Sequence, residues 1–209
     1  MLFQRLIRLM PWALPLGLIA QIALTVLAWN QSNGHLPAFA QAAARMTGEV
    51  SLFFFLLLTI QATTHPGFDR EQAYFRPKFL LFRDLAIMHL IHLVWLMLSM
   101  QWNHSAWLPI RATGGAIAYL LIFALPVMIE TQRIKEKALV NWQNIHLFWV
   151  WLVFTMTYTN RLSGANPQAT GSLVVWWPLF ILLIVLIFWR SMYMLLRQLE
   201  ARKKPDAEA

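Results

Sequence analysis

Cysteine is missing from this chain, and charge is scarce. Without cysteine the protein has no disulfides, iron–sulfur clusters, thiolate metal ligands or cysteine nucleophiles. Charged residues make up 12% of the 209 residues, which is about half the share usual in a soluble domain. The chain also lacks a glycine-rich dinucleotide fingerprint, a P-loop and an HExxH motif. It therefore brings no nucleotide-binding domain of its own.

Long apolar runs dominate what is present. Hydrophobic residues make up 59% of the chain, and the mean hydropathy is +0.53. A helix that crosses a bilayer needs about 20 residues. Six runs come close to or reach that length, at 9–29, 46–63, 84–102, 112–130, 140–160 and 173–192. The sequence predicts an all-α membrane protein, with one six-helix transmembrane domain over 1–200 and a solvated tail over 201–209.

The net charge of +8 follows the predicted topology. With the N-terminus in the cytoplasm, only Arg45, Arg111 and Arg161 of the 17 Lys and Arg residues lie outside. Cytoplasmic segments of membrane proteins are enriched in Lys and Arg, so we expect both termini in the cytoplasm. The basic charge then reflects orientation in a lipid bilayer and indicates no nucleic-acid partner. Met1–Trp29 is interpreted as an uncleaved first helix.

The segments between the runs give further expectations. "LPAFAQAAARMTGE" predicts a short outer amphipathic segment ahead of the second helix, and "HPGFDREQAYFRPK" predicts the largest inner loop. Gly114 and Gly115 favour close approach of another helix to the fourth span.

Ionisable side chains within membrane spans are costly, so each is a candidate functional residue. Three of the six histidines are predicted at span ends or in loops: His35, His65 and His104. The other three, His89, His92 and His146, lie inside spans. The carboxylates Glu49, Asp84 and Glu130 are expected near span ends, which disfavours a proton or ion carrier.

Depth indicates which histidines can meet. The third and fifth spans run in the same direction. His89 and His92 follow Arg83 by six and nine residues, and His146 follows Lys137 by nine. At about 1.5 Å per residue these depths agree within a helical turn. Two imidazoles at one depth on two helices can ligate both faces of a haem. Separate hydrogen bonds to neighbouring helices are the structural alternative.

Short motifs resemble the ferric reductase-like transmembrane domain superfamily. "NWQNIHLFWVWL", with Trp142, Gln143 and His146, is similar to its Trp-x-x-Leu-His signature. "IMHLIHLVW" occupies the place of its third-helix Leu-His motif, where His92 matches better than His89. The resemblance covers about 46–160. In size, the chain is most similar to the haem-binding membrane subunits of bacterial periplasmic methionine-sulfoxide reductases.

The resemblance implies a haem b electron-transfer protein of the bacterial inner membrane, as a subunit of an oxidoreductase. Electrons would come from quinol or a partner flavoprotein, with the quinone or flavin supplied from outside the chain, and pass to a periplasmic reductase or metal ion. His146 and His92 would be the axial ligands, with His89 as the alternate. Lys78 and Arg83 would face the propionates, or serve as ordinary positive-inside residues.

Trp142 and Gln143 would pack on the porphyrin or bond to its propionates, with an interfacial anchor as the alternative for Trp142. A second haem would need ligands 13–14 residues further out, about 20 Å away. Those positions hold Thr159 and the unpartnered His104, so we expect one haem per chain.

Two other functions stay open. His89, His92 and His146 are enough histidines for a catalytic zinc site in an intramembrane hydrolase. A non-catalytic scaffold or carrier is the third possibility.

The charge pattern makes a testable prediction of topology. Reporter fusions after Gly34 and Gly164 should be active only as periplasmic reporters, and a fusion after Ala209 only as a cytoplasmic one. A periplasmic reporter that is active after Ala209 would contradict the predicted orientation.

Overall fold

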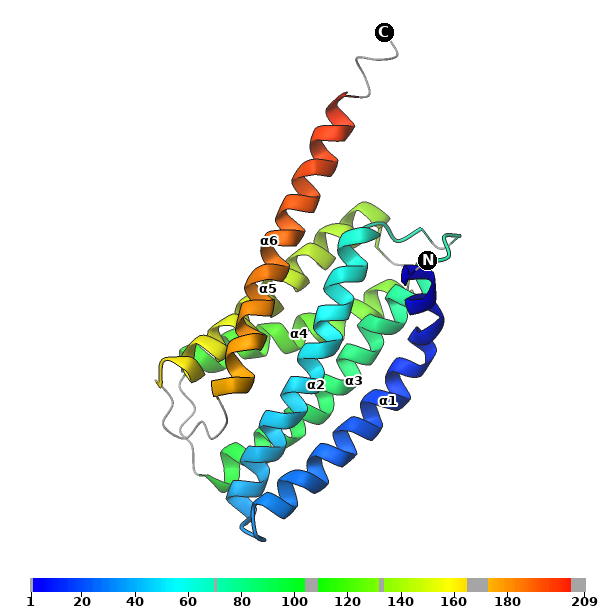
Figure 1. Ribbon diagram of the computed structural model, residues 1–209. Helices are drawn as coiled ribbons and strands as arrows, with labels where there is room; N and C mark the ends of the chain where they lie inside the picture. Colours follow the sequence, from blue (N-terminus) through cyan, green and yellow to red (C-terminus); the bar gives the residue numbers. More distant parts are fainter. Residues whose placement is uncertain (1, 70, 104–108, 132–133, 165–172, 204–209) are drawn as a thin grey trace.

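The computed structural model describes residues 2–69, 71–103, 109–131, 134–164 and 173–203. These residues form six α-helices and no β-strand. The helices are α1 (Leu2–Gln31), α2 (Leu36–Thr64), α3 (Phe75–Trp102), α4 (Pro109–Thr131), α5 (Glu136–Leu162) and α6 (Leu173–Lys203). Helix α1 begins and α6 ends at the same end of the bundle, and α6 extends well beyond it (Figure 1). The all-α architecture is confirmed.

Five helices are long and apolar enough to cross a membrane. They contain the spans Pro11–Gln31, Leu36–Thr64, Phe75–Trp102, Thr113–Thr131 and Leu173–Glu200. The protein thus has the helices of a multi-pass membrane protein. Helix α5 is long enough, at 27 residues, but falls outside this group. Asn, Gln, His and Thr side chains interrupt its apolar residues.

Helices α2 and α3 differ most from the predicted runs and begin ten and nine residues earlier. Helix α2 begins at Leu36, because the His35 ring caps it by accepting a hydrogen bond from the Ala38 amide at 3.4 Å. The alanine-rich segment that follows favours helix. A separate outer segment ahead of the second helix is therefore wrong. Helix α3 begins at Phe75, so its first turns replace part of the predicted inner loop.

Helix α2 lies at the centre of the packing. It contacts α1, α3, α5 and α6, while α4 packs between α3 and α5 (Figure 1). Within the described residues, the backbones of α3 and α5 make no direct contact, since α2 and α4 separate them. The space between α3 and α5 is filled by side chains of the main apolar core. Candidate site residues on these two helices therefore face a shared interior.

Helix α6 is attached to this core by polar contacts. The Arg190 guanidinium donates to Thr63 Oγ1 on α2 and Asn144 Oδ1 on α5, each at 2.6 Å. The Trp151 indole donates to the Leu183 carbonyl at 3.0 Å. These bonds hold α6 against α2 and α5 where apolar contact alone gives little preference over lipid.

Close helix packing occurs at a glycine that the sequence did not single out. A Cβ at Gly17 of α1 would lie 2.7 Å from the Phe54 ring and 3.1 Å from Met88 Sδ, so only glycine fits there. No described residue lies within 4 Å of a Cβ at Gly114 or Gly115. The predicted close approach at α4 is therefore wrong, and the close contact joins α1 to α2 and α3.

The packing predicts different tolerance at the two sites. Gly17→Val should lower the thermal unfolding temperature of the detergent-solubilised protein, because overpacking costs about 1–3 kcal/mol. The matched variant Gly115→Val, also in an apolar helix, should leave that temperature close to wild type. Equal unfolding temperatures for the two variants would contradict the placement of α1.

Candidate functional site

His89 lies inside the bundle on α3. Its side chain is buried, and its ring packs between Tyr119 of α4 and Phe154 of α5, at centroid distances of 5.1 and 5.8 Å. Its Nδ1 is buried without a hydrogen-bond partner. The ring therefore lies on the side of α3 that faces α4 and α5.

His92, one turn further along α3, lies against α2. Its Nδ1 is 3.4 Å from Thr47 Oγ1, and a Cβ at Gly48 would lie 3.0 Å from its Cε1. Gly48 therefore allows the ring to approach the α2 backbone closely. The His89 and His92 rings are 5.5 Å apart and steeply inclined to each other. The two imidazoles are neighbours that face different helices.

His146 on α5 is fully buried, and the hydrogen bond it makes fixes its tautomer. Its Nδ1 is 3.2 Å from the Leu121 carbonyl oxygen, and the Phe82 ring packs edge-on at 5.5 Å. A carbonyl only accepts, so Nδ1 carries the proton and Nε2 has a free lone pair. Nε2 is buried without a partner. Metal-bound histidines usually have this arrangement, with the other ring nitrogen donating to a carbonyl or carboxylate.

His89 and His146 were expected at the same depth, and the ring contacts show that they are not. His146 is paired with Phe82, seven residues before His89 on α3, and His89 is paired with Phe154, eight residues after His146. The two histidines are therefore staggered by about 10 Å along the helices, or about two turns. His92 lies three residues further away. His89 is close enough to His146 for the two rings to interact electrostatically.

Unpaired polar atoms concentrate on the same two helices. Within the part of the chain that the structure describes, six residues have buried side-chain atoms without a hydrogen-bond partner: Gln21, Gln61, His89, Gln143, His146 and Thr155. Four of these six lie on α3 or α5. Such atoms are costly in a membrane interior, so the space between α3 and α5 is the best candidate for a ligand site.

Buried imidazoles are the donors that ligate haem iron, but His89 and His146 could hold one iron together only if their stagger of about 10 Å closed. Buried imidazoles with free ring nitrogens lie on two helices that do not touch, and aromatic side chains surround them. The Phe82 and Phe154 rings occupy the space beside the imidazoles. A bound porphyrin would take the place of those ring contacts.

Lys78 is a buried cation beside the C-terminal end of α2. Its ammonium group donates to the carbonyls of His65, Pro66 and Gly67 at the end of α2, and it lies 3.8 Å from the Phe68 ring centroid. Carbonyls at a helix C-terminus attract a cation. Its three donors are thus in use within the protein, which favours a structural role for Lys78.

His65 belongs to the same corner and ends α2. Its ring stacks on Tyr74 at 4.6 Å, and Nδ1 is 2.9 Å from Thr64 Oγ1. Burial lowers the pKa of His65, and the nearby Lys78 and Arg197 lower it further. His65 is therefore neutral at pH 7 and adds no charge beside Lys78.

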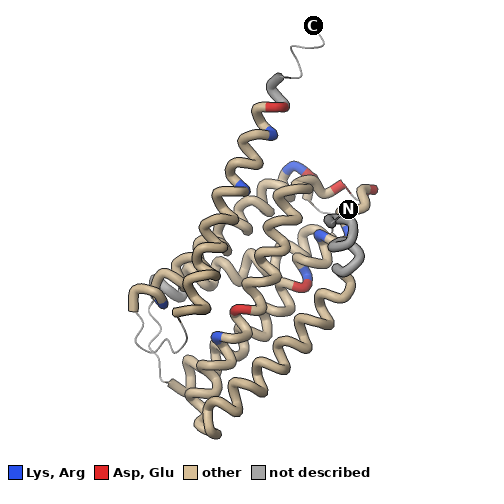
Figure 2. Tube along the Cα trace, viewed as in Figure 1, with Lys and Arg blue, Asp and Glu red and all other residues tan. Residues whose placement is uncertain are grey.

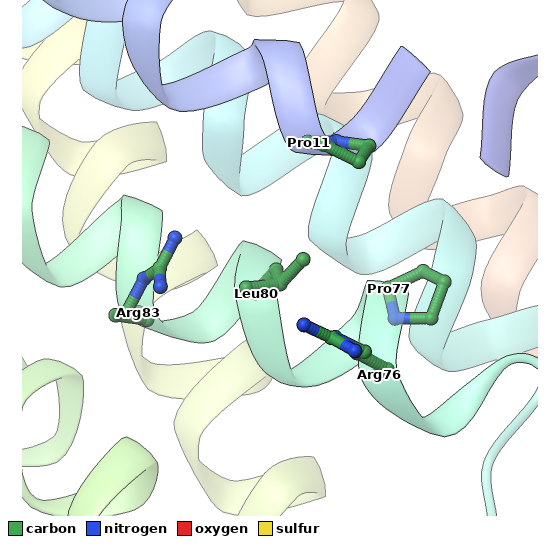
Figure 3. A pocket seen from close by; sticks show the side chains of 5 residues that line it. All are labelled: Pro11, Arg76, Pro77, Leu80 and Arg83. Atoms are coloured by element: carbon green, nitrogen blue, oxygen red, sulfur yellow. The ribbon is translucent and has the colours of Figure 1, made fainter. Parts of the chain in front are cut away.

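Arg83 lies on the α1 side of α3. Its Nε and Nη2 donate to Asp84 Oδ1 at 3.1 and 2.9 Å, and its side chain lines a groove beside Pro11 of α1 (Figure 3). Asp84 is buried nine residues into α3. The Arg83 guanidinium is thereby held to a carboxylate away from α5.

Trp142 and Gln143, the two other predicted cofactor contacts, differ in burial. Trp142 is 42% exposed, as an interfacial anchor would be. Gln143 is fully buried, and its Nε2 donates to the Pro66 carbonyl at 3.4 Å while Oε1 lacks a partner. Of the outer positions, Thr159 is exposed and bonds to the Thr155 carbonyl, and His104 lies outside the described residues.

Glu49 is a mid-helix carboxylate that the sequence analysis placed near a span end. It lies thirteen residues after Leu36 and fifteen before Thr64, about 20 Å from either end of α2. Figure 2 shows one basic and one acidic position part-way along α2, and the sequence of this helix has Arg45 and Glu49 as its charged residues. Arg161 of α5 is near enough to interact with both. The early start of α2 explains the error.

The histidines do not form a zinc site. No three His, Asp or Glu side chains in the described ranges are grouped so that they could hold a metal ion. The hydrolase alternative needs His89, His92 and His146 around one ion, but His92 faces α2 and His146 lies beside Phe82. That alternative therefore lacks its third ligand.

No family model, curated protein or solved structure matches this chain. The resemblance to ferric reductase-like domains therefore depends on short sequence motifs, of which "TGEVSLFFFLLLTIQATTHP" in the second helix is a further one.

The contacts of Lys78 predict its contribution to stability. Lys78→Met should lower the thermal unfolding temperature, because buried carbonyls at the end of α2 lose their donor at a cost of about 1–3 kcal/mol. Lys137→Met removes the same charge from an exposed position on α5 and should have little effect. Equal unfolding temperatures in detergent would mean that the Lys78 contacts contribute nothing.

Proposed function

We propose that this protein is a membrane electron-transfer protein that binds one haem b between α3 and α5. The single observation that supports this best is His146, whose Nδ1 donates to a carbonyl while its buried Nε2 has no partner. A histidine oriented in this way has a lone pair ready for a metal. The proposal also includes a bacterial inner-membrane location with both termini cytoplasmic.

His89 is the better second ligand on ring position. It faces α4 and α5 and has an unpaired Nδ1, whereas the His92 ring lies against Thr47 and Gly48 of α2. His92 remains the better match to the motif. The 5.5 Å spacing of the two rings places His92 where it can influence His89 without being a ligand.

Haem iron with two axial imidazoles is coordinatively saturated, which suits outer-sphere electron transfer. The protein's own residues keep this site dry and rigid. The Leu121 carbonyl fixes the His146 ring, and the Phe82 and Phe154 rings exclude water. The chain lacks a nucleotide-binding motif, so quinol or a partner flavoprotein would supply electrons for a periplasmic acceptor.

A proton or ion carrier is the second candidate function, and Glu49 favours it. A carboxylate about 20 Å from both ends of α2, near Arg45 and Arg161, has the position expected of an intramembrane proton or ion site. Colour separates the two candidates, because a carrier without haem has no visible spectrum.

Ligand substitutions test the haem proposal. The purified wild type should show a low-spin haem spectrum, oxidised and after dithionite reduction, with one haem per chain by pyridine haemochrome. His146→Ala and His89→Ala should lose it, since each removes an axial ligand. His92→Ala should keep low-spin haem, perturbed only through His89. His35→Ala, outside the site, is the matched control.

Each departure from these expected spectra has a distinct meaning. A colourless wild type, or low-spin haem in His146→Ala, would make the haem proposal wrong. Haem lost in His92→Ala and retained in His89→Ala would show that His92, the residue that matches the motif, is the second ligand. Two haems per chain would implicate His104.

A further inference from the structure

A basic groove lies between α1 and the first half of α3. Its volume is about 300 Å³, and it is lined by Pro11, Arg76, Pro77, Leu80 and Arg83 (Figure 3). Arg76, Leu80 and Arg83 are spaced by four and three residues, so they share one face of α3. The two arginine side chains lie on either side of Leu80, with Pro11 of α1 opposite (Figure 3).

The arginines that line the groove are exposed, whereas the carboxylate beside them is buried. Arg76 is exposed, and the Arg83 side chain is 44% exposed. The Asp84 carboxylate that Arg83 contacts is only 1% exposed. Asp84 therefore orients the Arg83 guanidinium from behind and leaves other N–H groups of the fork directed outward. The groove presents a net positive charge to whatever occupies it.

The surroundings of the groove are apolar on one side and polar on the other. Trp12 and Leu16 of α1 are more than 60% exposed, as side chains in contact with lipid tails would be. Arg76 lies in the first turn of α3, next to the charged segment that connects it to α2. The groove is thus at the level where apolar surface gives way to polar surface, which in a bilayer is the level of the phosphates.

We propose that this groove binds the phosphate of an anionic phospholipid. Arginine is suited to phosphate because its planar fork donates two parallel hydrogen bonds. Basic pockets between membrane helices are typical sites for anionic headgroups. The Pro11, Pro77 and Leu80 walls and the exposed face of α1 match the acyl chains, which free phosphate lacks.

This proposal is independent of the haem. Arg83 and Arg76 lie on the α1 side of α3, and the unpaired histidine atoms belong to the side that faces α4 and α5. A lipid in the groove would join α1 to α3. We therefore expect anionic lipid to stabilise the protein against thermal unfolding.

The test is a lipid titration of the full-length protein in neutral detergent, followed by thermal unfolding. Phosphatidylglycerol should raise the unfolding temperature in a saturable way, and phosphatidylcholine and inorganic phosphate should not. Arg76→Gln with Arg83→Gln should weaken the apparent affinity roughly 25-fold, at about fivefold per arginine near an anionic headgroup. Lys135→Gln with Lys137→Gln removes the same charge from the exposed segment at the start of α5 and should bind like wild type.

The single variant Arg76→Gln leaves the Arg83–Asp84 pair intact and should still lose roughly fivefold in affinity. This single variant tests the proposal if the double variant does not fold. The proposal is overturned if Arg76→Gln binds phosphatidylglycerol like wild type, or if the two double variants weaken binding equally. An equal rise with phosphatidylcholine would indicate general lipid stabilisation, and an equal rise with inorganic phosphate a free-anion site; either result also overturns it.

Discussion

A hydrocarbon environment offers no hydrogen bonds, and this constraint governs how the protein treats each buried polar group. Thr47, Thr59 and Thr63 of α2 donate to carbonyls one turn back along their own helix. Lys78 is buried because three carbonyls just after α2 accept hydrogen bonds from its ammonium group. The atoms that escape this rule are few in the described ranges, and most of them lie on α3 and α5. They therefore make the space between α3 and α5 the best candidate for a ligand site.

The arrangement of helices gives these atoms a common location. Because α2 and α4 separate α3 from α5, His89 and His146 project from opposite sides into one interior. The phenylalanines beside them make that interior apolar. Arg83 lies outside this interior, so the proposed haem site and the proposed lipid groove are on different sides of α3.

Sequence patterns predicted the helices well because apolar runs of spanning length have few other stable structures. They predicted helix ends less well. The predicted spans stopped where polar residues interrupt the apolar runs. Helix α2, however, begins before its predicted span, in an alanine-rich segment that packs against α1 and α3. That error placed Glu49 near a span end. It is a consequence of reading hydropathy alone, since helix propensity and the His35 cap decide where α2 begins.

The sequence by itself determined that the chain is a helical membrane protein, and it identified the intramembrane histidines, because these depend on composition and local order. Only the tertiary structure decided which way each imidazole faces, and that His89 lies nearer His146 than His92 does. It also decided that the Lys78 ammonium group donates its hydrogen bonds to backbone carbonyls. The reason is that rotation and stagger of packed helices depend on contacts such as Gly17 with Phe54 and Gly48 with His92. Those contacts join residues distant in the chain, and no local pattern encodes them.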